Sequence, residues 1–176
     1  MVKLVVPGIN DLATLYPEVA AEADGWDPST ILSGSHKKLS WKCKKGHTWK
    51  TRVADRTGKD HTQCPYCSNR KVWSGFNDLQ TKFPEIAKEA DGWDPSQVIS
   101  GSNNKMPWKC RRGHTWEVTV NQRTGRDETQ CPYCTNSKVW TGFNDLQTKF
   151  SDVAAEADGW DPSLVISGSN KRLSWK

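Results

Sequence analysis

The sequence repeats itself with a period of 67 residues, and this period restricts the fold to a series of small modules. Copies of one segment begin at Gly8, Gly75 and Gly142, and the last two both read GFNDLQTKF. A second segment lies between successive copies, LSWKCKKGHTWK in the first unit and MPWKCRRGHTWE in the second. Each copy of such a repeat forms one supersecondary unit that packs on its neighbours. We therefore expect a lead-in over 1–7, complete units over 8–74 and 75–141, and a truncated unit over 142–176.

The truncated third unit reaches LSWK and stops at Lys176, one residue before its first Cys would fall. It therefore has no metal ligands, and we expect the chain to be part of a longer protein. Its helical segment keeps the apolar positions of the other two copies. If each helical segment packs on the preceding module through Trp73 or Trp140, residues 142–176 should be ordered and cap the second unit.

Hydrophobic residues make up 35% of the chain, which gives modules of this size only thin cores. The stabilisation must come partly from elsewhere, and six Cys in two complete units indicate where. No apolar run approaches the ~20 residues that span a bilayer, and no signal peptide is recognisable at the start. We expect a soluble, intracellular (cytoplasmic) protein that does not bind membranes.

Three Cys and one His recur in each unit with the spacing C-x3-H-x16-C-x2-C, which is typical of a tetrahedral zinc site. Disulfides would leave one Cys unpaired in each unit, and an iron–sulfur cluster usually takes four thiolates. Because four protein ligands leave zinc no open position, we predict two structural ions. The ligands are Cys43, His47, Cys64 and Cys67 in the first unit and Cys110, His114, Cys131 and Cys134 in the second.

Local patterns predict a small α+β module. Asn10 or Asn77 is a candidate N-cap for a first helix, and Pro17 begins a second that ends at Asp24-Gly25. Residues 39–43 and 48–53 should form a β-hairpin around the CKKGH turn, and Gly46 should adopt a positive φ there. Residues 54–63 should form a polar loop. Trp26 should cover the small core rather than stack on a ligand.

The order NDL, PEVAAEADGWDP, LSWKC, KGHTW and CPYC resembles the tandem zinc-ribbon, or treble-clef, repeats of bacterial and viral proteins. The resemblance covers nearly the whole chain and implies the same eight zinc ligands. It also implies a module without enzymatic activity that binds nucleic acid and in some proteins accompanies a nuclease-like domain.

The charge pattern gives an independent reason to expect a polyanionic partner. Residues 10–30 carry five acidic and no basic side chains, whereas residues 36–71 carry eleven Lys or Arg against two Asp. Basic side chains beside Trp rings suit phosphate contacts and base stacking. The candidate nucleic-acid contacts are Lys42, Lys44, Lys45, Arg52, Arg56 and Lys59 in the first unit and Lys109, Arg111, Arg112, Arg123 and Arg126 in the second.

Other interpretations of these charges stay open. The cations can neutralise the acidic helical segments or serve a protein–protein interaction scaffold, and Arg56 and Arg123 can each brace a helical carboxylate instead of anchoring a phosphate. A nuclease of the His-Asn-His type needs a His beyond the zinc ligands, but His36 and His61 occur in the first unit only. We therefore expect no catalysis within this chain, and a catalytic domain would have to lie outside it.

Overall fold

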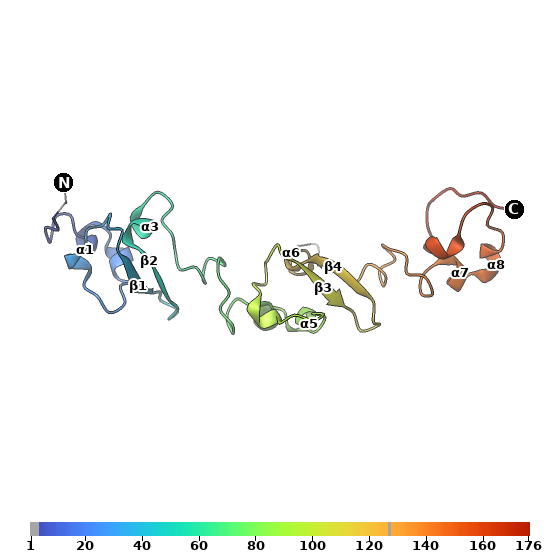
Figure 1. Cartoon of the computed structure of the whole chain (residues 1–176), viewed down its shortest axis with the longest axis horizontal. Helices are drawn as coiled ribbons and strands as arrows, with labels where there is room; N and C mark the ends of the chain where they lie inside the picture. Colours follow the sequence, from blue (N-terminus) through green and yellow to red (C-terminus); the bar gives the residue numbers. More distant parts are fainter. Residues whose placement is uncertain (1–3, 127) are drawn as a thin grey trace. The chain divides into compact units, whose positions relative to one another are not determined.

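The computed structural model describes residues 4–126 and 128–176. The chain divides into two compact units, Met1–Trp73 and Ser74–Lys176, so the second and third repeats lie together in one unit. Figure 1 shows the helices and strands of each unit. Among the described residues, no helix has the length and apolar character needed to cross a membrane.

The first unit places two short helices and a 3-10 turn before a β-hairpin and one further helical turn. Its elements are α1 (Leu12–Leu15), α2 (Pro17–Ala20), the 3-10 helix η1 (Pro28–Thr30), β1 (Lys38–Lys42), β2 (Thr48–Arg52) and α3 (Val53–Thr57). β1 and β2 pair antiparallel with Trp41 opposite Trp49. Ala23 forms a bridge to Trp41 on the other side of β1, so β2 is the outer strand.

The second unit repeats this order and then repeats its helical part once more. The second repeat contains α4 (Leu79–Lys82), α5 (Pro84–Ala87), η2 (Pro95–Gln97), β3 (Lys105–Lys109), β4 (Thr115–Thr119) and α6 (Val120–Thr124). The third contains α7 (Leu146–Lys149), α8 (Ser151–Ala154) and η3 (Pro162–Leu164). The structure thus confirms the predicted class, small α+β modules that each join a short helical segment to a hairpin with the zinc ligands.

One tryptophan forms the centre of each complete module. Trp41 and Trp108 are fully buried, and each contacts the first helix of its repeat and the helix after the hairpin through a cluster of apolar side chains. Burying one Trp removes roughly 150–250 Å² from water, an upper limit of about 4–6 kcal/mol at ~25 cal/mol per Å². Trp26 packs edge-on against Trp41 and donates from Nε1 to the Ser40 carbonyl, so it covers this core as expected.

The third repeat builds the helical layer without closing a core. Ala157 still bridges to Trp175, and Trp160 packs edge-on against that ring. Trp175 nevertheless stays 46% exposed, whereas its counterpart Trp41, which pairs with β2, is 0% exposed. The third repeat contacts the repeat before it through Phe143 and Asn144.

Three local predictions were wrong. The N-cap of the first helix is Asp11 rather than Asn10, with the Thr14 N–H donating to its carboxylate, and Asp78 likewise replaces Asn77. The second helix ends at Ala20, well before Gly25, because the Glu22 carbonyl accepts from the Lys42 N–H beside β1 instead of continuing the helix. Part of the predicted loop over 54–63 is helical, since α3 reaches Thr57.

Candidate metal centre

The turn between β1 and β2 brings the first two ligands together. The Cys43 N–H donates to the His47 carbonyl at 3.0 Å, and the Gly46 N–H donates to the Cys43 carbonyl at 2.8 Å. Gly46 has φ = +85°, in the left-handed region that side chains disfavour, as its position predicts. Gly113 has the same φ in the second unit. The hairpin turn therefore points a thiol and an imidazole in one direction.

The CPYC segment supplies the other two ligands from a second turn. The Ser68 N–H and hydroxyl both donate to the Cys64 carbonyl, and the Arg70 N–H donates to the Pro65 carbonyl at 2.8 Å. The equivalent bonds recur at Thr135 and Ser137. These bonds hold each pair of thiols on a compact loop that faces the hairpin turn.

The four ligand atoms of each unit lie within 4.8 Å of one another. Zinc bonds of ~2.3 Å to sulfur and ~2.0–2.1 Å to nitrogen place tetrahedral ligands about 3.8 Å apart for two sulfurs and about 3.6 Å apart for sulfur and nitrogen. Nδ1 of His47 lies 3.4–3.7 Å from the three sulfurs, and Sγ of Cys43 lies 3.8 Å from Sγ of Cys67. The corresponding range for Nδ1 of His114 is 3.4–3.6 Å. Both predicted ligand sets are therefore sized for zinc.

The electrostatics of the thiols favour a bound cation. Burial raises the pKa of Cys67 to about 12, and the hydrogen bonds and charges of Cys64 and Cys43 act in the same direction. Burial alone would also raise the pKa of Cys43, but backbone N–H groups of Lys45 and His47 reverse this effect and lower it. Three neighbouring thiolates repel one another, and a divalent ion removes this cost because it binds them in the deprotonated form.

Aromatic rings cover the imidazole of each site. His47 contacts Tyr66 and Trp73 at centroid distances of 5.7 and 4.9 Å. His114 contacts Tyr133 and Trp140 in the same way. It also contacts Phe143, which belongs to the third repeat, at 4.3 Å. The second site is therefore closed partly by residues that follow it in the next repeat.

Asn144 fixes this junction through its amide. Its Nδ2 donates to the carbonyls of Tyr133 and Lys138, both at 2.9 Å, and to Oδ1 of Asn136 at 3.2 Å. Its Oδ1 accepts from the Trp140 N–H at 2.7 Å. The residue is 2% exposed. Sequence reasoning missed this role, since an Asn before a helix is more often a cap.

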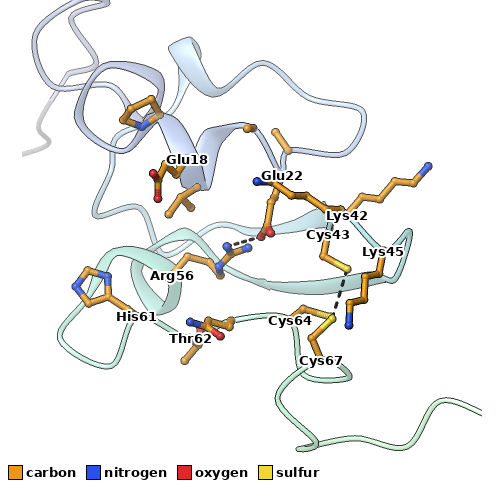
Figure 2. A pocket seen from close by; sticks show the side chains of 16 residues that line it. Glu18, Glu22, Lys42, Cys43, Lys45, Arg56, His61, Thr62, Cys64 and Cys67 are labelled. Carbon is orange, nitrogen blue, oxygen red and sulfur yellow. Dashed lines mark hydrogen bonds and ion pairs between the residues drawn. The ribbon is translucent and has the colours of Figure 1, made fainter. Parts of the chain in front are cut away.

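Arg56 and Arg123 act as internal braces in the structure. Arg56 is 6% exposed, and its Nη2 donates to the Glu22 carboxylate at 2.5 Å. Its guanidinium lies over the rings of Trp41 and Trp49. Figure 2 shows Arg56 and Glu22 on one side of a pocket and Cys43, Cys64 and Cys67 on the other. Arg123 repeats the arrangement with Glu89. Of the two interpretations of these arginines, the structure favours the brace over the phosphate anchor.

The remaining predicted cations all lie on the surface. They are Lys42, Lys44, Lys45, Arg52 and Lys59 in the first unit and Lys109, Arg111, Arg112 and Arg126 in the second. Arg52 pairs with Asp55 at 2.9 Å, and Arg111 approaches Glu85 at 3.7 Å. Pairs as exposed as these contribute little to stability and open easily to a stronger anion.

Comparison with known proteins agrees with this geometry. A family model described as a probable treble clef zinc finger domain matches residues 18–70 and 85–137, together more than half of the chain. Each match runs from the second helix of a repeat to the residues just after CPYC, and so includes all four ligands. No curated protein matches the chain.

Proposed function

The chain belongs to the probable treble clef zinc finger family, and from this premise we propose that its two zinc modules bind nucleic acid through the phosphate backbone. The zinc has a structural role in this proposal, because four protein ligands complete its tetrahedron. The modules would act as an accessory region that recruits or positions a partner activity, such as a nuclease-like domain outside this chain.

The observation that carries the proposal is the pair of cations on each zinc-anchored turn. Lys44 and Lys45 lie between ligands Cys43 and His47, and Arg111 and Arg112 occupy the same places in the second unit. All four side chains are exposed, while the turn beneath them is held by the metal and by backbone hydrogen bonds. A rigid turn presents charges to a phosphate with little loss of backbone entropy on binding.

The acidic residues of the first helical segment are largely engaged elsewhere. Asp11 and Asp27 cap α1 and η1, and Glu22 pairs with Arg56. Among the described residues, neither Lys42 nor Lys44 forms an ion pair with that segment. For Lys44, this contrast favours an external anion over internal neutralisation; in the second unit Arg111 approaches Glu85 only at 3.7 Å, in an exposed pair.

Salt-dependent binding of purified, zinc-loaded protein to DNA and RNA tests the proposal. Changing Lys44 and Lys45 to Ala, or Arg111 and Arg112 to Ala, should weaken binding to all sequences alike. The slope of log K against log salt should shrink by about 0.7–0.9 for each phosphate that the variant no longer neutralises. The matched control is the double change Lys171→Ala and Arg172→Ala, which removes two exposed cations of the third repeat.

An affinity that does not change with salt would contradict the proposal, as would equal losses in the control and in the turn variants. Failure to bind any nucleic acid, with specific capture of a protein, would favour the protein–protein scaffold instead.

A further inference from the structure

A groove of about 530 Å³ lies beside the outer strand β2 of the first unit. Its lining includes basic side chains from the hairpin, from the loop after α3 and from the residues that follow CPYC, namely Lys38, Lys50, Lys59, Arg70 and Lys71. Asp55 and Asp60 also line it, and Asp55 is paired with Arg52. The groove therefore carries an excess of positive charge. Only Lys59 of these cations is among the nucleic-acid contacts predicted from sequence.

Most of these cations form no ion pair within the part of the chain that the structure describes. Among the described residues, Lys38, Lys50, Lys59 and Arg70 form no ion pair, and all four are exposed. Lys38 lies opposite Arg52 and Lys50 lies opposite Ser40, so the two lysines are diagonal neighbours on one face of the hairpin. Like charges this close on a sheet repel one another. A bound polyanion would relieve that repulsion.

The second unit differs at two of these positions. Glu117 stands in the place of Lys50, and Ser137 stands in the place of Arg70. Glu117 pairs with Lys105, the counterpart of Lys38, at 3.2 Å. On the second hairpin, Glu117 therefore neutralises the charge of Lys105, whereas on the first hairpin no such pair forms between Lys38 and the residue at position 50.

An aromatic ring lines the same groove. Trp49 is half-buried and contributes to the lining, whereas its counterpart Trp116 is only 8% exposed. Tyr66 from the CPYC turn lines the groove as well. A cationic channel with aromatic side chains is the arrangement that binds single strands, because phosphates meet the cations while unpaired bases stack on the rings.

We propose that this groove binds a single strand of nucleic acid, with phosphates against Lys38, Lys50, Lys59 and Arg70 and a base against Trp49. The inference rests on the proposed function and narrows it to the groove beside β2 in the first unit. The groove volume lies within the ~300–1,000 Å³ of ligand-sized sites and suits a nucleotide rather than a duplex.

A reciprocal exchange of charge tests the groove in the full, zinc-loaded chain. Lys50→Glu gives the first unit the residue of the second, and Glu117→Lys does the reverse. Binding of labelled oligothymidylate, oligouridylate and a DNA duplex is measured over a series of salt concentrations, beginning at low salt. For the single strands we expect Lys50→Glu to lower affinity roughly tenfold and to reduce the salt slope, and Glu117→Lys to raise affinity. Both positions are exposed, so zinc content and circular dichroism should stay unchanged.

Lys171→Glu is the matched control, because it makes the same change of charge in the third repeat. A loss equal to that of Lys50→Glu would mean that only net charge matters and would overturn the inference. Tighter binding of the duplex than of either single strand would also overturn it. The two single strands differ in sugar and base, so their comparison shows whether the groove prefers DNA or RNA.

An abasic oligonucleotide tests the stacking contact without changing the protein. It keeps the phosphates and lacks the bases, so it should bind more weakly than oligothymidylate. Equal affinity would refute the role of Trp49. Failure of the unaltered protein to bind any of these probes would overturn the proposed function itself, whereas binding that ignores Lys50 and Glu117 would overturn this inference alone.

Discussion

Replacing Asn144 with Ala should weaken the second zinc site from a position outside its ligand set. The side chain is buried and makes four hydrogen bonds to the CPYC segment and the residues just after it. Its neighbour Phe143 packs on the His114 imidazole. The substitution removes the amide and leaves two carbonyls and one N–H of the backbone without these partners. Since the ligands Cys131 and Cys134 flank the Tyr133 carbonyl, the loss acts directly on the turn that presents them.

The size of the effect follows from the bonds removed. A typical hydrogen bond contributes about 0.5–1.5 kcal/mol net, and a buried group left without a partner costs about 1–3 kcal/mol. Four bonds in one buried side chain therefore suggest a loss of about 2–4 kcal/mol. If folding and metal binding are one transition, the zinc affinity of this site falls roughly 30- to 700-fold.

Competition with a chromophoric zinc chelator measures this loss of affinity. Each of the two sites releases one equivalent of zinc per chain, so the two releases can be followed separately. In Asn144→Ala one equivalent should transfer at a lower chelator concentration and the other should not change. Asn10→Ala is the matched control, because Asn10 occupies the same repeat position, but its side chain bonds, among the residues that the structure describes, only to its close neighbours Val6 and Leu4. Identical chelator curves for the two variants would refute the proposed coupling between repeats.

Three further predictions concern metal, the third repeat and the internal brace. Purified protein should contain two zinc ions, and Cys64→Ser should lose one ion while the second unit keeps its own; elemental analysis measures both contents. Lower pH should weaken both zinc sites, because protons compete with the ion for the thiolates. Deleting 142–176 should destabilise the second unit more than the first, and hydrogen exchange should find 142–162 protected in the intact, metallated protein. Glu89→Gln should lower the free energy of unfolding by about 1–3 kcal/mol, since it leaves the buried Arg123 guanidinium without a counter-charge. The loss is limited because the Glu89 side chain is partly exposed. Denaturant titration compares that variant with Glu117→Gln, which removes the same charge from an exposed ion pair. A larger loss of stability in Glu89→Gln would show the effect of burying the pair.

The zinc ligands could be predicted from sequence because their chemistry depends on residue type and spacing, both of which are visible in one dimension. The hairpin was also predictable to within one residue, since its Trp and Thr positions favour strands and Gly46 permits the turn. The choice between Asn10 and Asp11 as N-cap was not, because both are good caps and only the tertiary structure decides between them.

Long-range contacts set the other limit on prediction. The pairing of Arg56 with Glu22 joins residues 34 positions apart and depends on how the helical segment folds back on the hairpin. The asymmetry between Lys50 and Glu117 was visible in the sequence, but its meaning was not. Its structural role depends on the strand register, which places Lys50 and Lys38 on one face of the hairpin, and on the groove, which Arg70 also lines.

The contact of Phe143 and Asn144 with the second zinc site means that the sequence repeat and the physical module are out of phase. A fragment cut at residue 141 would keep all four ligands and still lack the ring over His114 and the amide that ties down the CPYC turn. The second module as a folding object therefore extends past the start of the next GFND. Exchange or transplantation of this module should use breakpoints inside the following helical segment, because a join at the sequence boundary would separate the metal site from Phe143 and Asn144, which pack on it.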